Sequence, residues 1–288
     1  MFTTLLDTAT LAAHLQDPDW VIVDCRFALD DPAWGERQYA AGHVPGAVYA
    51  RLDRDLSGAR TGTNGRHPLP DPADAARTFG RWGVSAGSQV VAYDQDAGPY
   101  ASRLWWLLRW LGHDGVAVLD GGFARWAAEG RSTDTAPPSR AARVFAAAPR
   151  ASMTVSTNEL LGMVERPDTC LVDARAPERY RGEIETLDRV AGHIPGATNH
   201  FFMRNVNEDG TFRPMDELRR EWRQTAAGTE PDRMVCYCGS GVTACHNLLA
   251  LEHAGVKGAR LYPGSWSEWS NDPSRPMVRA DRPDAGAT

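Results

Sequence analysis

The sequence predicts an α/β protein with two tandem domains, each built on an open, mostly parallel sheet with helices on both faces. Short β-rich runs alternate along the 288 residues with segments whose apolar side chains recur at helical spacing. Motifs of the first half also recur in the second half in the same order. A chain of this length accommodates two ordinary domains, so we interpret the repeat as a duplicated domain.

Strands are expected where apolar and β-branched residues cluster. In chain order they are Trp20–Asp24, Gln89–Tyr93, Val116–Leu119, Cys170–Asp173 and Met234–Tyr237. Helical spacing is clearest for the leucines at 104, 107, 108 and 111, and for Leu248 and Leu251 after an expected helix start near Ala244. Ligands of open sheets bind beyond the carboxyl ends of the strands, so the residues that follow each strand are candidates for a site.

Three motifs define the repeat. GHVPGA at 42–47 recurs as GHIPGA at 192–197, VDCR at 23–26 as VDAR at 172–175, and LDGG at 119–122 as LYPG at 261–264. Between the halves, a stretch rich in Ala, Pro, Ser and Arg lacks a sustained apolar period and is typical of a linker. We therefore expect an N-terminal domain at 1–131, a linker at 132–152 and a C-terminal domain at 153–288.

The loop CGSGVT at 238–243 carries the strongest chemical signal. It places Cys238 between an expected strand and an expected helix, where backbone amides and the helix dipole favour an anion. A free cysteine titrates near ~8.5, and such surroundings can make it a thiolate at neutral pH. Gly239 and Gly241 let the backbone turn its N–H groups toward the sulfur. We favour a nucleophilic cysteine over a structural one.

Two other cysteine chemistries fit less well. The loop lacks the arginine that closes the phosphate-binding loop of cysteine phosphatases. A zinc site of Cys236, Cys238, Cys245 and His246 lacks a second ligand pair at finger-like spacing. Aligning the strand that ends at Tyr93 with the one that ends at Tyr237 sets Asp94 opposite Cys238, so the first domain is expected to be inactive.

Composition limits the classes of partner and the cellular compartment that we expect for this protein. A net charge of -6 and a pI near 5.8 offer no general attraction to nucleic acid or to an anionic membrane. The first residues lack a signal-peptide pattern, and no apolar run is long enough to span a membrane. Five irregularly spaced cysteines do not form a disulfide framework. We expect a cytoplasmic protein.

Taken together, these motifs resemble the tandem-domain rhodanese family of sulfurtransferases over nearly the whole chain. The matching segments are both GHxPGA turns, LDGGF at 119–123, the Cys238 loop and GSWSEW at 264–269. The resemblance implies two rhodanese-like domains, an active C-terminal one and an inactive N-terminal one. The loop CGSGVT is similar to that of 3-mercaptopyruvate sulfurtransferases, whereas thiosulfate-specific members usually carry CRKGVT. A loop without two cations also attracts a small dianion less strongly.

The resemblance implies roles for further residues. Ser240, His67 and Asp53 would form a hydrolase-like triad, and Arg179 and Arg189 would hold the donor's carboxylate and keto oxygen. The remaining loop residues, Gly239, Gly241, Val242 and Thr243, would bind the donor with them. From the residues alone, His67 and Asp53 read as surface positions, and Arg189 reads equally well as part of a surface ion-pair network.

The resemblance also implies partners and leaves alternatives open. The expected donor is 3-mercaptopyruvate, and the expected acceptor is thioredoxin, a small thiol or cyanide, with no metal or organic cofactor. The alternatives are a thiosulfate sulfurtransferase, a non-catalytic persulfide carrier, and a redox sensor that pairs Cys236 or Cys245 with Cys238. His43 and His193 recur in both halves, so we expect them to build the two turns.

Overall fold

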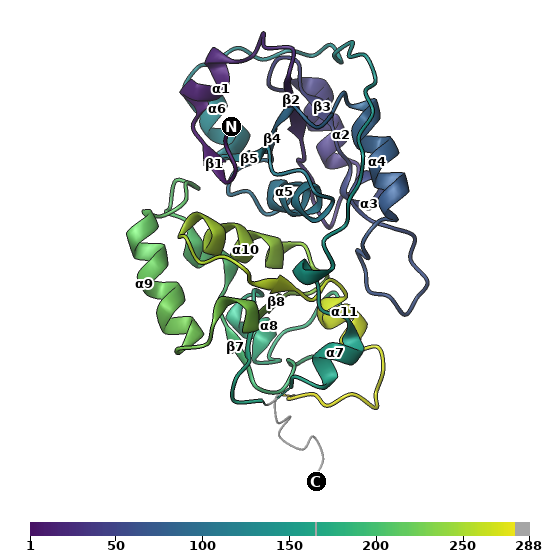
Figure 1. Cartoon of the computed structure of the whole chain (residues 1–288), viewed down its shortest axis with the longest axis vertical. Coiled ribbons are helices and arrows are strands. Elements are labelled where there is room, and N and C mark those ends of the chain that lie inside the picture. The colour runs from purple at the N-terminus through teal and green to yellow at the C-terminus, as the bar shows by residue number, and fades with distance from the viewer. Residues whose placement is uncertain (165, 280–288) are drawn as a thin grey trace, which may run out of the picture.

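The computed structural model describes residues 1–164 and 166–279, and it contains two parallel sheets, one in each half of the chain (Figure 1). The first sheet has the order β1-β5-β4-β2-β3 and the second the order β7-β6-β8-β9. The strands are β1 (Leu5–Leu6), β2 (Trp20–Asp24), β3 (Val48–Tyr49), β4 (Gln89–Tyr93), β5 (Val116–Leu119), β6 (Cys170–Asp173), β7 (Ala197–Asn199), β8 (Met234–Tyr237) and β9 (Arg260–Leu261). All five strands expected from the sequence are confirmed.

Helices connect the strands in both halves. The first half has α1 (Thr8–Ala13), α2 (Trp34–Ala41), α3 (Leu52–Asp55), α4 (Pro72–Arg81), α5 (Ala101–Trp110) and α6 (Gly122–Ala128). The second half has α7 (Thr157–Leu161), α8 (Pro177–Tyr180), α9 (Met215–Ala226), α10 (Thr243–His253) and α11 (Ser265–Trp269), with short 3-10 turns η1 (Ala151–Met153), η2 (Phe202–Asn205) and η3 (Pro231–Arg233). Helix α10 begins one residue before the expected start.

Each sheet is covered on both faces because side chains alternate along a strand. In β2, Val21 and Val23 pack with α4 and α5, whereas Trp20 and Ile22 pack with α1 and α6. The second sheet follows the same plan, with α9 and α10 on one face and α7 and α11 on the other. The expected α/β fold with helices on both faces of two parallel sheets is therefore confirmed.

The two halves share one hydrophobic core at their boundary. Helices α5 and α10 pack against each other there, and a single cluster of buried side chains includes residues of both (Figure 1). The chain between the halves, 132–150, contains no helix or strand. After α3, the N-terminal half extends a long loop toward α11 of the C-terminal half (Figure 1). This loop brings residues of the first half to the carboxyl end of the second sheet.

The two GHxPGA turns have matching contacts in the two halves. His43 stacks on Tyr39 and bonds its carbonyl oxygen, and His193 does the same with Tyr180. Such identical contacts are expected of residues that build the turn. Beside each turn lies a buried arginine–aspartate pair that forms part of the repeated fold, Arg26–Asp24 and Arg175–Asp173.

Asp94 occupies the position in the first half that Cys238 occupies in the second, at the end of the matching strand. Its buried carboxylate accepts N–H bonds from Gly98, Tyr100 and Ala101 at 2.7–3.0 Å. Burial raises the pKa of Asp94 to about 6, although these amides lower it. The amide-lined anion position of the first half is thus filled by a side chain of the protein itself.

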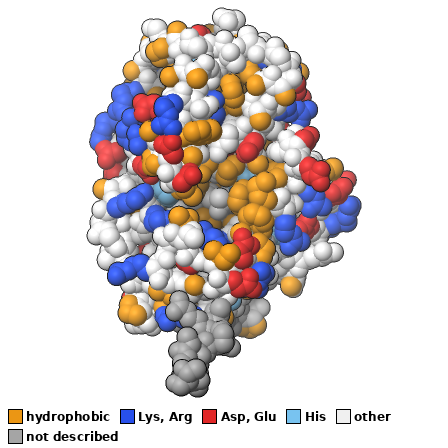
Figure 2. All heavy atoms as spheres, turned by 180° about the vertical axis from the view of Figure 1, so that it is seen from behind, with side chains coloured by type: hydrophobic (Ala, Val, Ile, Leu, Met, Phe, Trp, Pro, Cys, Tyr) orange, Lys and Arg blue, Asp and Glu red, His pale blue; other side chains and the backbone are white. Residues whose placement is uncertain are grey.

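The surface carries no large region of a single charge on the face drawn in Figure 2, where basic and acidic side chains are interspersed and hydrophobic ones gather near the middle. Each helix within 1–164 and 166–279 is too short or too polar to cross a membrane. Within the same residues, no three His, Cys, Asp or Glu side chains are grouped so that they could hold a metal ion.

Candidate active site

The Cys238 loop is fastened to the segment that follows β9. The Cys238 N–H donates to the Ser265 hydroxyl at 3.1 Å, and the Cys238 carbonyl accepts from the Trp266 N–H at 2.9 Å. The Gly239 carbonyl accepts from the Ser267 N–H at 2.9 Å. These contacts hold a loop of small residues in one conformation, so the sulfur has a defined position.

Both glycines of the loop let neighbouring groups lie close to the loop backbone. Gly241 has a φ of +76°, and a Cβ atom there would lie 2.4 Å from the carbonyl oxygen of Pro263. A Cβ atom on Gly239 would lie 2.7 Å from Nη2 of Arg66 and 3.6 Å from Nη1 of Arg179. The bare backbone at Gly239 therefore lets two guanidinium groups reach the loop that carries Cys238.

The Cys238 thiol is buried, with 2% exposure, yet its pKa is lowered. Burial alone would raise this pKa, but hydrogen bonds from the Thr243 hydroxyl and from the Ser240 and Ala244 amides outweigh it. The Gly241 N–H also donates to the sulfur, at 3.1 Å. Val242 and Thr243 contribute by starting α10, whose amides point toward the loop. The surroundings therefore stabilise a thiolate.

At the other four cysteines, the surroundings raise the pKa of the thiol instead of lowering it. Burial raises the pKa of Cys25 and Cys236 well above its usual value, that of Cys170 to about 11 and that of Cys245 to about 12. Only a thiolate is an effective nucleophile, so these thiols are inert at neutral pH by comparison. The contrast distinguishes Cys238 from every other cysteine of the chain.

We expect this contrast to appear in alkylation kinetics. The rate at which iodoacetamide modifies Cys238 should follow a titration midpoint below the ~8.5 of a free cysteine. Thr243→Val removes a hydrogen bond that favours the thiolate, so its midpoint should lie at a higher pH. Mass spectrometry of peptides after alkylation from pH 5 to 10 measures both midpoints. An unchanged midpoint in Thr243→Val would contradict the assigned cause.

Ser240, His67 and Asp53 meet at the domain boundary. The Ser240 hydroxyl lies 2.8 Å from Nδ1 of His67, and Nε2 of His67 lies 3.2 Å from Oδ1 of Asp53. Asp53 belongs to α3 and His67 to the long loop, whereas Ser240 is 173 positions further along the chain. The structure therefore brings together the three residues that the resemblance singles out.

The partners of His67 determine where its proton lies. Burial lowers the pKa of His67, and the hydrogen bond to His67 lowers the pKa of Asp53. An ionised Asp53 only accepts, so Nε2 of a neutral His67 donates to it. Nδ1 of His67 then accepts the Ser240 O–H. In such an arrangement a proton can pass between the Ser240 hydroxyl and Nδ1 of His67.

Arg103 ties the two sides of the triad together. Its fully buried guanidinium donates to the Gly241 carbonyl at 3.0 Å and to the His67 carbonyl at 3.1 Å. These two bonds join the cysteine loop of one domain to the histidine loop of the other. The distance between Ser240 and His67 therefore depends on a residue of α5 that contacts neither side chain.

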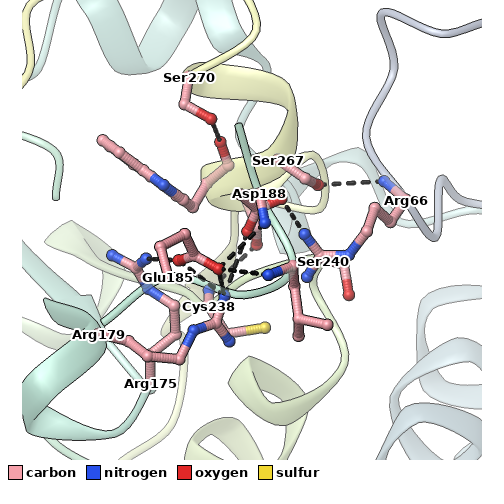
Figure 3. Close-up of polar contacts among 12 residues, drawn as sticks. Arg66, Arg175, Arg179, Glu185, Asp188, Cys238, Ser240, Ser267 and Ser270 are labelled. Carbon is pink, nitrogen blue, oxygen red and sulfur yellow. Dashed lines mark hydrogen bonds and ion pairs between the residues drawn. The ribbon is translucent and has the colours of Figure 1, made fainter. Parts of the chain in front are cut away.

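Arg179 and Arg66 lie beside the cysteine loop, close to the buried carboxylates of Glu185 and Asp188 (Figure 3). Arg179 donates to Glu185 at 2.7 and 2.9 Å and to Asp188 at 3.2 Å. Arg66 donates to the other oxygen of Asp188, and its N–H is held by the Ser267 hydroxyl at 3.0 Å. Burial lowers the pKa of Arg66 to about 10, and the nearby Cys238 raises it.

Arg189 lies apart from this group. It is exposed and lines a neighbouring cavity of about 230 Å³ together with Arg60, Arg66 and Asp188. The structure thus places Arg66, and not Arg189, against Gly239. A larger cavity of about 1220 Å³ is lined by Trp105, Arg150 and Arg260 among others, but Cys238 does not line it. The candidate site at Cys238 therefore lies outside this larger cavity.

Sequence reasoning missed Arg66, Asp188 and Arg103. Arg66 adjoins His67 in sequence, which is a weak signal that could have suggested it. Nothing local distinguishes Asp188 from the other acidic residues of its segment or Arg103 from a surface arginine of a helix. Their roles depend on contacts between residues more than a hundred positions apart.

Comparison with known proteins agrees with this geometry. The rhodanese-like domain family matches residues 7–129 and 156–272. The chain belongs to the rhodanese family. The "Probable 3-mercaptopyruvate sulfurtransferase" of Pseudomonas aeruginosa is 49% identical over 279 residues, which cover 96% of this chain and 98% of the relative.

Further rhodanese relatives are more distant. The thiosulfate sulfurtransferase of Rattus norvegicus is 32% identical, with 93% of this chain and 92% of the relative covered. The solved structure of the 3-mercaptopyruvate sulfurtransferase from Leishmania major has a TM-score of 0.82 at 31% identity and covers 93% of this chain and 74% of that chain. The expected membership in the rhodanese family is confirmed, whereas the domain boundaries at 131 and 153 and the roles of individual residues stay predictions.

Proposed function

We propose that this protein is a sulfurtransferase that moves the sulfur of 3-mercaptopyruvate through a persulfide on Cys238 to a thiol acceptor or cyanide, releasing pyruvate. The observation that carries the proposal is the pairing of a thiolate-stabilising loop with the Ser240–His67–Asp53 chain. The names of the Pseudomonas and Leishmania relatives support the same donor. The neutral side chains at 239 and 240 support it as well, because they add no cations for a dianion.

In the first step, the Cys238 thiolate attacks the sulfur of the donor. An S–S bond forms, the C–S bond breaks, and its electron pair passes to the carbon, which leaves as the enolate of pyruvate. Arg179 is proposed to hold the donor's carboxylate because a planar guanidinium binds it in bidentate fashion. Arg189 stays a prediction for the second arginine, and Arg66 is the alternative that the contacts around Gly239 favour.

The enolate must then gain a proton. The donor's own thiol proton can pass through Ser240 to Nδ1 of His67 and return to the enolate carbon, so that Cys238 ends as a persulfide anion. Asp53 stabilises the imidazolium formed between these transfers, as an ionised carboxylate 3.2 Å away would. The amides that favour the thiolate also favour the persulfide anion.

An acceptor completes the cycle. A thiol such as thioredoxin or a small thiol, or cyanide, attacks the outer sulfur of the persulfide and restores the Cys238 thiolate. No cofactor takes part in any of these steps. Thioredoxin as the acceptor is a proposal that rests on the chemistry of exchange between thiolates and sulfur.

Intact-protein mass spectrometry tests the proposal. Reduced protein exposed briefly to 3-mercaptopyruvate should gain the mass of one sulfur, and a thiol or cyanide should remove it. Cys238→Ser should gain none, and thiosulfate should load the wild type less completely. If neither donor loads sulfur onto Cys238, the proposed function is wrong, and a carrier loaded by a partner protein becomes the better hypothesis.

A thiosulfate sulfurtransferase is the second candidate, and the cations around Gly239 favour it. Arg66 and Arg179 both approach the loop, and the rat relative bears that name. The ratio of kcat/KM for the two donors decides between the candidates. A higher value for thiosulfate would replace the first proposal with the second.

A further inference from the structure

Asp188 stands between the two arginines that face the cysteine loop. One of its oxygens accepts from Arg66, which comes from the N-terminal half, and the other accepts from Arg179 at 3.2 Å (Figure 3). Its side chain is only 4% exposed. The two guanidinium groups are therefore tied to one carboxylate that solvent barely reaches.

Asp188 is itself held in place by the backbone. Its N–H and that of Leu187 donate to Oε1 of Glu185 at 3.0 and 2.9 Å. Glu185 in turn binds Arg179 and lies 3.5 Å from Arg175, whose main partner is Asp173. Hydrogen bonds and ion pairs thus hold the carboxylates of the turn at 185–188 against the arginines.

The charges of the ion-pair cluster beside the loop cancel in this arrangement. Arg66, Arg175 and Arg179 supply three positive charges, and Asp173, Glu185 and Asp188 supply three negative ones. The buried Arg103, which donates to the Gly241 carbonyl, adds one positive charge that a Cys238 thiolate balances. The repulsion that the Asp188 carboxylate exerts on a donor grows with the donor's charge, so it disfavours thiosulfate, a dianion, more than 3-mercaptopyruvate, which carries one charge when its thiol is protonated.

We propose that Asp188 is a specificity-determining residue, because its carboxylate, shared by Arg66 and Arg179, limits the positive charge available to a dianionic donor. The proposal rests on the proposed function, in which these arginines face the donor. It predicts that the preference for 3-mercaptopyruvate comes partly from Asp188, in addition to the neutral loop at 239–240. Removing this charge should therefore help thiosulfate more than 3-mercaptopyruvate.

Steady-state kinetics of Asp188→Asn test this inference against Glu183→Gln. Glu183 lies on the same segment, is half exposed and pairs with Arg181, so its variant removes one negative charge without touching the site. Asp188→Asn should raise the ratio of kcat/KM for thiosulfate to that for 3-mercaptopyruvate by about tenfold. Glu183→Gln should leave the ratio unchanged. The rise should shrink at high salt, because the effect is electrostatic.

Two further variants separate charge from geometry. Asp188→Glu keeps the charge and should keep the wild-type ratio, whereas Arg66→Gln removes a cation and should lower it. Any of three results would overturn the inference. The ratio of kcat/KM values could stay unchanged in Asp188→Asn, or rise equally in Glu183→Gln. It could also shift in Asp188→Glu as much as in Asp188→Asn. If Asp188→Asn does not fold, a ratio that fails to fall in Arg66→Gln overturns it instead.

Failure of the underlying function gives a different result. If the wild type gains no sulfur from either donor in the mass measurement, both the proposed function and this inference are overturned. If the wild type forms the persulfide but the ratio does not respond to Asp188, only the inference is overturned.

Discussion

Cys238→Ser is expected to abolish turnover with every sulfur donor, lowering kcat/KM by on the order of 10⁴-fold or more. A serine hydroxyl is not ionised at neutral pH in this loop and cannot hold a transferred sulfur as a persulfide. Pyruvate release from 3-mercaptopyruvate and thiocyanate formation from thiosulfate measure the two activities. Both should fall together, because both donors depend on the same nucleophile.

Cys25→Ser and Cys245→Ser are the matched controls for this prediction. Both cysteines are buried, and their pKa values are raised, so neither should act as a nucleophile. Each variant should keep most of the activity of the wild type when its melting temperature is unchanged. A folded Cys245→Ser variant as inactive as Cys238→Ser would mean that the nucleophile is wrongly assigned.

Ser240→Ala and His67→Ala should slow 3-mercaptopyruvate much more than thiosulfate. Loss of a positioned acid–base group costs ~10²- to 10⁴-fold when a proton must be transferred. The enolate of pyruvate needs a proton, whereas sulfite leaves from thiosulfate without one. Measuring kcat/KM for both donors in each variant separates the relay from general damage to the site.

The double variant that carries both Ser240→Ala and His67→Ala tests the proton relay in a second way. Ser240 and His67 are proposed to act as one unit, so removing both should cost hardly more than removing either. Asp53→Asn should show a smaller loss in the same direction, because the imidazole keeps its place but loses its charged partner. Equal losses on both donors in the single variants would remove the proton relay from the mechanism.

Much of the fold could be predicted because it repeats and because its patterns are local. The strands Gln89–Tyr93 and Met234–Tyr237 are buried along their length, and apart from Gln89 each is a short continuous apolar run. The turns at 42–47 and 192–197 give the offset between the two copies. The prediction that the first domain is inactive rests on one alignment, which sets Asp94 opposite Cys238.

The residues of the candidate site also differ in whether the local sequence could predict them. Cys238 could be singled out from the sequence because the small residues that surround its sulfur are its neighbours in the chain. His67, Asp53 and Arg179 came from the resemblance to a family, since their own neighbours do not distinguish them from surface residues. Arg189, assigned in the same way, lies on the rim of a neighbouring cavity and not against Gly239.

By itself the sequence determined a duplicated α/β fold, a single candidate nucleophile and a loop without cations. Only the tertiary structure decided that Arg66 reaches Gly239, that Asp188 pairs with two arginines and that Arg103 joins the two loops. The reason is physical. Periodicity and loop chemistry are expressed among near neighbours, whereas the charge balance of a site between two domains exists only after distant segments have packed together.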